Sequence, residues 1–406
     1  MNDKNGTKIV LIIYVLFEVY QTYLQLRLLI QKSINNYQME FIKYPSIDTN
    51  TKPTRSKNPS DKWIVTEKVH GANFSIYLDL ANIGAEGWLK TAKRTGFMTP
   101  EDKVQFPCDE WLARNKDNLE QTARNAVAYL AQLGTTSLIA GTYLVIFGEF
   151  YGGWFPSNPS DWQGSRSLPT EMKAYADSHD GVRPRPVQWD IYYSPQHEFV
   201  CFDMVVIDPE HKSVDETGKP VLASEVVRYQ NWLPSEFIRT QPIPQVPLMF
   251  SGTLAECVEF ANSSAKYVNS AVPELLHGLP SLAPGTNIIE GVVVSPASGA
   301  HFSYKIKNNA FQETVKTAHV PKKERGQPAG HPFLGYITRN RWNAVRSKYG
   351  VISLQELKTA FEEDALTDFT SANPGAKLIN LDAQYLRDAI TKFYSELGEL
   401  DESILL

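Results

Sequence analysis

The chain of 406 residues is 42% hydrophobic and 21% charged, and its formal net charge is −5. This composition excludes a disordered or fibrous protein and is typical of soluble globular domains, and the length favours two or three of them. The three cysteines lie far apart and form no CxxC pair, which favours a reducing intracellular setting over a disulfide framework or a cysteine zinc site.

The first 38 residues differ from the rest. Residues 9–17, IVLIIYVLF, are apolar, but Glu18 and Gln21 follow them. A membrane-spanning helix needs about 20 apolar residues, so we predict no membrane span, and a signal peptide would need a small-residue cleavage site that is absent. Residues 1–38 are therefore interpreted as an extension of unclear role before a domain that opens at Met39. A cytoplasmic location is the default expectation, with organelle targeting by the extension left open.

Five short runs carry the pattern of β-strands, because they are rich in β-branched and aromatic residues and are bounded by glycine or polar residues. They are residues 63–69, 143–150, 198–207, 288–295 and 302–307. Between the first two runs, residues 109–134 show helical spacing of apolar side chains and end on Gly134, which is typical of a helix C-cap. Residues 151–197 are rich in Pro, Gly, Ser and Trp and predict a long loop insertion.

The last part of the chain changes to helical patterns. Ser353 and Glu356 form a capping-box pattern at the start of an amphipathic helix, and residues 382–397 repeat the helical spacing. We therefore predict an α+β domain over residues 39–325, followed by a small all-helical domain over residues 333–406.

A basic segment overlaps this boundary. Residues 305–348 contain ten lysine or arginine residues and only two acidic residues. Such a local excess of positive charge favours a polyanionic partner. A solvated, lysine-rich connecting segment is the alternative, and charge alone does not choose between the two.

Charged residues interrupt several of the predicted strands. They are Lys68, Glu149, Glu290, Lys305 and Lys307. In an ordinary strand each would face water, but residues 305 and 307 share one face because strands alternate with period two. A lysine becomes a nucleophile when nearby cations or a metal ion lower its pKa, and carboxylates with substrate phosphates can hold Mg²⁺. The set therefore predicts attack of Lys68 on the α-phosphate of a nucleotide.

Six motifs around these residues occur in a characteristic order: EKVHGANF, AKRTGF, FGEFYGG, EFVCFDMVV, IIEGVVV and SYKIKNNAFQE. The chain resembles, from about Met39 to its end, the RNA ligase 2 family of covalent nucleotidyltransferases, which includes phage enzymes and kinetoplastid RNA-editing ligases. The segment GYITRNRWNAVRSKYG is similar to the phage-type helical domain, whereas GGWFP and the following loop are more like the editing ligases. The resemblance implies an ATP-grasp-like nucleotidyltransferase domain of antiparallel sheets with flanking helices, followed by the helical domain.

The resemblance also implies a role for each motif residue. Lys68 would form the lysyl–AMP adduct, Glu290 would bind the catalytic metal ion, and Lys305 and Lys307 would hold the α-phosphate. Further contacts to ATP or AMP would come from Glu67 at the adenine, Val69 beside the nucleophile, Asn73 and Arg94 at the sugar and phosphates, Glu149 at the ribose hydroxyl and Phe202 stacked on the base. His70 would contact phosphate, with a structural histidine as an equal alternative.

The implied function is that of an ATP-dependent RNA ligase that uses Mg²⁺ or Mn²⁺. It would join 3′-OH and 5′-phosphate RNA ends at nicks in a duplex, through lysyl–AMP and RNA-adenylate intermediates, in RNA repair or RNA editing. The RNA would be held by His70, Arg94, Arg339, Arg341, Arg346 and Lys348. A monomer is expected, and the 151–197 loop would either bind an accessory protein or be a plain surface insertion.

Three alternatives share part of this pattern. A DNA ligase or an mRNA guanylyltransferase would use the same lysine chemistry, but each is expected to carry an OB-fold where residues 335–406 predict helices. A nucleotide- or RNA-binding protein without catalysis is the third alternative. The presence of every charged motif residue argues against it, because binding alone does not need Lys68.

Overall fold

The computed structural model describes residues 39–47, 61–134, 141–156, 162–163, 186–188, 191–210, 227–263, 267–299, 303–308, 311, 332–349, 353–372 and 390–395. The predicted extension at residues 1–38 lies outside the described residues. Most of the predicted loop at 151–197 and most of the last predicted helix, 382–397, also lie outside them.

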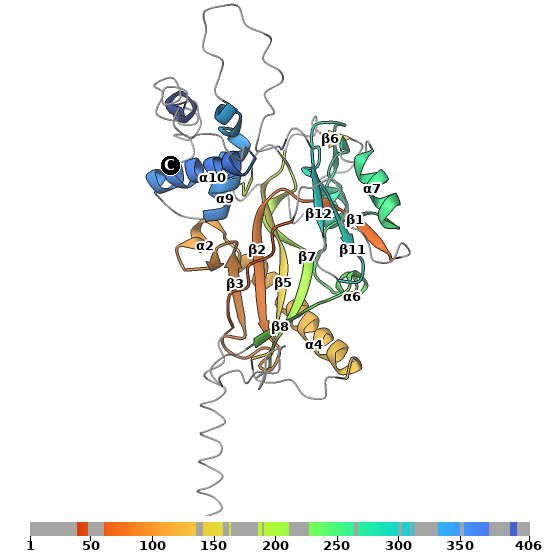
Figure 1. The fold of residues 1–406 in the computed structure, drawn as a ribbon. Helices are drawn as coiled ribbons and strands as arrows, with labels where there is room; N and C mark the ends of the chain where they lie inside the picture. Colours follow the sequence, from red (N-terminus) through yellow and green to blue (C-terminus); the bar gives the residue numbers. More distant parts are fainter. Residues whose placement is uncertain are drawn as a thin grey trace, which may run out of the picture.

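The larger sheet is antiparallel and, within the described residues, has six strands in the order β4-β3-β2-β5-β7-β8 (Figure 1). They are β2 (Ala72–Asp79), β3 (Leu89–Lys93), β4 (Gly96–Phe97), β5 (Tyr143–Trp154), β7 (Ser194–Glu210) and β8 (Val227–Trp232). Strand β5 pairs with β2 on one side and with β7 on the other. The register between β5 and β7 shifts at Gly148, directly before Glu149, and such a shift bends the strand locally.

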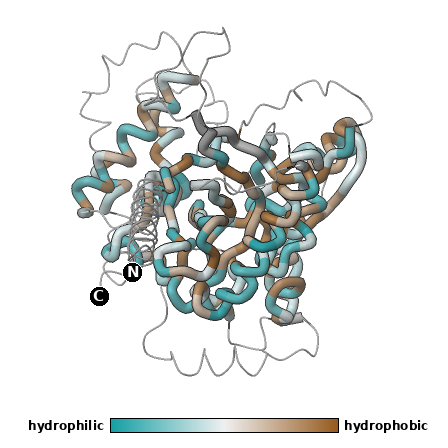
Figure 2. Tube along the Cα trace, turned by 90° about the horizontal axis from the view of Figure 1, so that it is seen from below, coloured by the Kyte–Doolittle hydropathy of each residue, from teal (hydrophilic) through white to brown (hydrophobic). Residues whose placement is uncertain are grey.

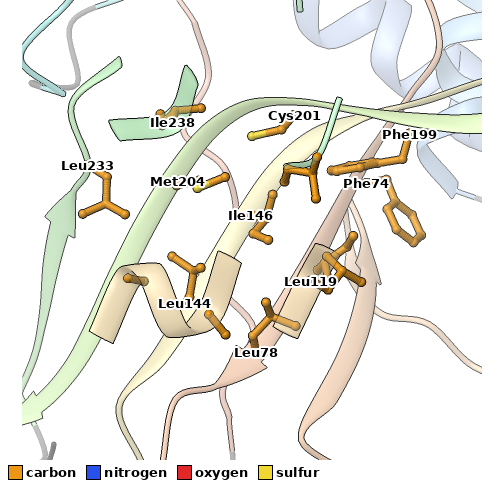
Figure 3. Packing of buried hydrophobic residues seen from close by; sticks show 14 of the residues in the cluster. Phe74, Leu78, Leu119, Leu144, Ile146, Phe199, Cys201, Met204, Leu233 and Ile238 are labelled. Atoms are coloured by element: carbon orange, nitrogen blue, oxygen red, sulfur yellow. The ribbon is translucent and has the colours of Figure 1, made fainter. Parts of the chain in front are cut away.

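Both faces of this sheet are covered, so its strands are buried on two sides. Figure 3 shows Phe74 and Ile146 of the sheet near Leu119 of helix α4 (Lys116–Gln132), and all three belong to one buried cluster. The opposite face packs against residues 39–47. In Figure 2, hydrophobic and hydrophilic stretches alternate along much of the tube.

A break divides the single helix predicted over residues 109–134. Helix α3 (Asp109–Arg114) ends at Asn115, and α4 begins at the next residue. The Asn115 side chain donates a hydrogen bond to the carbonyl oxygen of Trp111, a local contact that competes with continuation of the helix. The predicted end is confirmed, because Gly134 adopts a φ of 94° just after α4.

The smaller sheet carries the first and last of the charged motifs. Its strand order is β12-β11-β1-β9, and all its pairs are antiparallel. The strands are β1 (Trp63–Lys68), β9 (Leu248–Gly252), β11 (Gly291–Pro296) and β12 (Tyr304–Lys307). Helix α7 (Leu254–Asn262) covers one face, where Cys257 packs with Val65 and Val292.

Shorter elements lie between these strands and helices along the chain. They are α2 (Asp102–Gln105), β6 (Trp162–Gln163), α6 (Ser235–Arg239), α8 (Val272–His277) and β10 (Ser281–Leu282). Strands β6 and β10 pair with each other. In the part of the chain that the structure describes, no helix has the length and apolarity needed to cross a membrane.

The C-terminal part is helical, as predicted. It contains the 3₁₀ turn η4 (Pro332–Tyr336) and helices α9 (Arg339–Tyr349) and α10 (Leu354–Ala372). The predicted capping box is confirmed, since Ser353 and Glu356 exchange backbone and side-chain hydrogen bonds. Helix α9 lies against β2 of the larger sheet (Figure 1). The α+β fold class with a helical C-terminal part is therefore confirmed.

Arg341 corrects one expectation for this part. Its side chain is 0% exposed and donates to Asp364 and, at 2.7 Å, to Asp368. The guanidinium thus ties α9 to α10, and its carbon lies 5.8 Å from the centre of the Tyr336 ring. The sequence suggested that Arg341 would contact RNA, but in this fold a buried arginine paired with two carboxylates holds the helices together.

Candidate active site

Lys68 stands at the end of β1, where the antiparallel pairing places it opposite Gly291 of β11. This register brings Glu290, the residue before Gly291, beside the lysine. The Lys68 Nζ atom lies 2.5 Å from Oε2 of Glu290, and the two side chains are 21% and 4% exposed. A lysine from one end of the chain and a glutamate 222 residues later thus form a largely buried ion pair.

The Glu290 carboxylate contacts two more basic groups. His70 Nδ1 lies 3.2 Å from Oε2, and Lys307 Nζ lies 3.2 Å from Oε1. Burial alone would raise the pKa of Glu290, but the charges of Lys68, His70 and Lys307 outweigh burial and hold the pKa well below its ordinary value. Glu290 is therefore an ionised carboxylate at the centre of a cationic cluster.

A cavity of about 320 Å³ opens beside this cluster and is bordered by both sheets and the C-terminal helices. The residues predicted from the sequence that line it are Glu67, Lys68, Val69, His70, Asn73, Arg94, Glu149, Phe202, Glu290, Lys305, Lys307 and Lys348. The other predicted site residues, Arg339, Arg341 and Arg346, are not among its lining residues. The fold thus brings the nucleotide-site candidates together and leaves all three predicted helical arginines outside the lining.

Glu149 lies across the cavity on β5, directly opposite Asn73 of β2. Its Oε1 accepts a hydrogen bond of 3.1 Å from the backbone amide of Gly71. Burial raises the pKa of Glu149 to about 7, with Lys68 opposing the increase and Glu290 adding to it. A carboxyl group with this pKa is suited to hydrogen bonding with a sugar hydroxyl in either protonation state.

Glu67 precedes Lys68 but points its carboxylate the other way, as strand alternation dictates. Its oxygens accept hydrogen bonds from the Ser270 hydroxyl at 2.5 Å and from the Ala271 amide at 3.1 Å. Burial raises the pKa of Glu67 to about 7. Its backbone amide donates to the Pro247 carbonyl at 3.0 Å. Glu67 therefore anchors the strand that carries Lys68, and it lines the cavity without offering this carboxylate or this amide to it.

An aromatic region forms another side of the cavity. Phe202 of β7, predicted to stack on a base, is half-buried and lies 4.9 Å, ring centre to ring centre, from Tyr44. The Tyr44 hydroxyl donates to Asp203 at 3.2 Å, and burial raises the pKa of Asp203 to about 7. The buried Val69 packs nearby with Phe202 in one hydrophobic cluster. This apolar region suits a flat heterocyclic base.

Sequence reasoning missed several lining residues, among them Tyr44 and Gln188. Tyr44 lies 24 positions before Lys68, outside every motif, and reaches the site only through packing against the larger sheet. The Gln188 side chain donates to the Gly71 carbonyl at 3.1 Å and comes from the region interpreted as a loop insertion. Neither carries a local signal that could have identified it.

Lys305 and Lys307 lie on β12, and both line the cavity, as the period-two argument predicted. Ile306 between them packs on the other side into the cluster of the smaller sheet. The close pairing of β12 with β11 depends on Gly291, because a Cβ atom there would lie 2.1 Å from the Ile306 carbonyl oxygen. The absence of a side chain at position 291 therefore sets the position of both lysines.

Gly291→Ala is expected to lower the free energy of unfolding by about 1–3 kcal/mol, because the added methyl group forces β12 away from β11. Urea denaturation followed by circular dichroism measures the change. Gly96→Ala is the matched control, because no atom lies within 4 Å of a Cβ at that position. Gly96→Ala should change the free energy of unfolding by no more than about 0.5 kcal/mol. Equal stabilities of the two variants would contradict the proposed close contact.

The donor set also limits how a metal ion could bind. Among the described residues, no group of three His, Cys, Asp or Glu side chains could hold one alone. Mg²⁺ usually keeps several waters and is held by one or two carboxylates together with substrate phosphates. Glu290, ionised and beside the cavity lysines, fits that mode for Mg²⁺ or Mn²⁺ when a nucleotide supplies the other oxygens.

Comparisons with known proteins point the same way as the geometry. A family model described as RNA ligase matches residues 61–307. The mitochondrial RNA-editing ligase 1 of Trypanosoma brucei brucei is 26% identical over 396 residues, which cover 91% of this chain and 75% of that relative.

Two solved structures are also similar at low identity. An archaeal ATP-dependent RNA ligase shares 16% identity over 89% of this chain and 74% of its own, with a TM-score of 0.31. A Naegleria gruberi RNA ligase variant solved with ATP and Mn shares 14% identity over 68% of this chain, with a TM-score of 0.29. The similar region spans 60% of that Naegleria protein.

Proposed function

Because the chain belongs to the RNA ligase family, whose model matches residues 61–307, we propose that it is an ATP-dependent enzyme that joins 3′-OH and 5′-phosphate RNA ends through Lys68. Family membership confirms both the resemblance in the motifs and the prediction of an RNA ligase. The observation that carries the finer proposal is the pairing of Lys68 with buried Glu290 in a cavity that also contains Arg94 and Lys305.

The first step proposed is transfer of AMP to the protein. Lys68 Nζ attacks the α-phosphorus of ATP, an N–P bond forms, and pyrophosphate leaves. Lys305 and Lys307 hold the phosphate oxygens, and Glu290 orients the nucleophile. Phe202 and Tyr44 enclose the base, while Glu149 accepts a hydrogen bond from a ribose hydroxyl.

A metal ion held by Glu290 and the phosphates would neutralise negative charge on the nucleotide. ATP with Mg²⁺ or Mn²⁺ is accordingly the proposed cofactor set. The protein side chains then need only position the reacting groups, which is the main requirement of phosphoryl transfer.

The later steps concern RNA. We propose that AMP passes from Lys68 to the RNA 5′-phosphate, and that the neighbouring 3′-OH then displaces it. Arg94 and His70 would contact the 5′-phosphate, and Arg339 and Arg346 of α9 would contact the backbone around a nick. The 2′-hydroxyls and A-form shape would favour RNA over DNA.

The domain limits and setting are proposed as they were predicted. Residues 39–325 form the adenylyltransferase domain and residues 333–406 the RNA-binding helical domain. We propose a monomer inside the cell. A mitochondrial relative is compatible with an organelle as the location. Organelle targeting by residues 1–38 and an accessory protein bound at residues 151–197 are part of the same proposal.

The test begins with protein from which any bound AMP has been removed by pyrophosphate. The protein should become labelled by ATP carrying ³²P at the α-phosphate and not at the γ-phosphate, and mass spectrometry should locate the AMP on Lys68. Labelled GTP separates ATP specificity from that of a guanylyltransferase. Absence of label would support a binding protein without catalysis.

The substrate is tested with nicked duplexes that differ only in the sugar on each side of the nick. We expect sealing when the 3′-OH strand is RNA and little sealing when both strands at the nick are DNA. Faster sealing of the all-DNA nick would favour a DNA ligase. Faster sealing of single-stranded RNA ends would contradict the proposed preference for a nicked duplex.

A further inference from the structure

One face of helix α9 borders the nucleotide cavity rather than solvent. Asn340, Ala344 and Lys348 are spaced by four residues, so they follow one stripe of the helix, and all three line the cavity with Lys68. The small side chain of Ala344 at the middle of the stripe allows the helix to approach closely. Trp342 and Val345 on the neighbouring stripe are buried in the core of the helical part, and Val345 also lines the cavity.

Lys348 is fixed at the end of this stripe. Its Nζ donates to Oδ1 of Asp364 at 2.9 Å, and the buried Arg341 holds the other oxygen of the same carboxylate. Asp364 is therefore shared by two cations, of which Arg341 also pairs with Asp368. The lysine side chain is 33% exposed, so its end stays accessible from the cavity. An ammonium has three N–H donors and can contact this carboxylate and phosphate oxygens together.

Cationic side chains reach the cavity from more than one element of the fold. Lys305 and Lys307 come from one strand of the smaller sheet and are assigned to the α-phosphate. Among the described residues that line the cavity, Lys348 is the single lysine or arginine contributed by the helical part. The β- and γ-phosphates of ATP carry most of its negative charge, and they must extend beyond the α-phosphate toward another part of the lining.

We propose that Lys348 binds the pyrophosphate portion of ATP, so that the helical part completes the nucleotide site during transfer of AMP to Lys68. This inference rests on the proposed function and assigns to the nucleotide a residue that the sequence suggested would bind RNA. Lys68, paired with Glu290 as an ammonium, first gives one proton to solvent, and as the resulting amine forms the N–P bond a second proton passes to solvent. The bond from the α-phosphorus to its bridging oxygen breaks, and the electron pair leaves with pyrophosphate, whose charge Lys348 stabilises.

The experiment separates the AMP step from the RNA step. AMP-free wild type, Lys348→Ala, Lys348→Arg and Lys103→Ala are labelled with α-³²P ATP in a single turnover. Each is also given a nicked RNA duplex whose 5′-phosphate at the nick already carries AMP. Sealing of this nick needs no ATP. Lys103→Ala is the matched control, because Lys103 pairs with Asp109 at 2.7 Å and does not line the cavity.

We expect Lys348→Ala to label about ten-fold more slowly, as loss of a hydrogen bond to a charged group predicts, and to seal the pre-adenylated nick at the wild-type rate. Lys348→Arg should recover most of the labelling rate, and Lys103→Ala should match wild type. Sealing of the pre-adenylated nick also shows that each variant is folded. In the reverse reaction, the pyrophosphate concentration that half-saturates AMP release from labelled protein should rise about ten-fold for Lys348→Ala.

Two outcomes would overturn the inference. Normal labelling with slow sealing of the pre-adenylated nick would indicate that Lys348 binds RNA rather than pyrophosphate. Equal loss in both reactions would show a general role in the site rather than a contact to pyrophosphate. Failure of the proposed function itself is distinguishable, because the wild-type protein would then take up no label.

Discussion

Lys68→Ala will take up no AMP from ATP, with a loss of at least about 10⁴-fold against wild type, because removal of the nucleophile removes the covalent step itself. The structure places no second lysine in an equivalent position among the described residues, since Lys305 and Lys307 lie on a different strand from Lys68. Single-turnover labelling with α-³²P ATP on a denaturing gel measures the loss.

A pre-adenylated nick distinguishes loss of chemistry from loss of folding in this variant. Lys68 is not consumed once AMP is on the RNA, so Lys68→Ala should still seal that nick at a measurable rate. Lys103→Ala, which alters an exposed lysine–aspartate pair, should behave as wild type in both reactions. Labelling of Lys68→Ala at the wild-type rate would place the adduct on another residue and remove the basis of the proposed function.

The strands around this nucleophile could be predicted because their signals are local. Residues 63–69 and 302–307 were recognised from alternation and β-branched content, and they form β1 and β12 almost to the residue. The run at 143–150 extends to Trp154 in β5. Strand β11 begins at Gly291, three residues later than predicted. Periodicity thus identified the elements and gave their ends less accurately.

The contact between Lys68 and Glu290 could not be derived from spacing, because it depends on pairing of β1 with β11 across 222 residues. Sequence supplied the residue types, and the family resemblance supplied their roles. The sharing of a face by Lys305 and Lys307 is different, since two residues on one strand obey the period-two rule without knowledge of the fold.

Arg341 shows why composition misled for the helical part. Its residue type and basic neighbourhood suggested a surface contact with RNA, but Asp364 and Asp368 lie one helix further on and pair with its buried guanidinium. The segment contains ten basic residues, and its local sequence does not distinguish those that bridge helices from those that face a partner. Burial is a tertiary property, and helix spacing alone does not determine it.

Glu290→Gln will slow AMP labelling by about 10²–10³-fold, the range expected when one preorganised electrostatic group is removed from a site. Glutamine keeps the shape of the side chain but not its charge. Lys68, His70 and Lys307 then lose the carboxylate that all three contact, so they repel each other and Lys68 loses its orientation. Labelling at several Mg²⁺ concentrations measures the loss, which excess metal should not restore.

The same substitution should lower the free energy of unfolding at pH 7 by roughly 2–3 kcal/mol, somewhat less than for a fully buried pair because Lys68 and Lys307 keep some exposure. The pKa of Glu290 in the fold lies below its unfolded value of about 4.3. Its ionisation therefore adds stability above that pH, and the contribution is lost as pH falls through the folded-state pKa.

Urea denaturation at pH 7 and below pH 4 measures this dependence, and the difference between wild type and Glu290→Gln should shrink at the lower pH. Glu236→Gln is the control, because Glu236 is exposed and lies 3.5 Å from Lys62 in a surface pair, which is typically worth less than about 1 kcal/mol. A stability difference that does not change with pH would contradict an ionised Glu290 at the centre of the cluster. Normal labelling by Glu290→Gln would contradict its role in orienting Lys68, since the position of that lysine depends on this carboxylate more than on any other contact described for it.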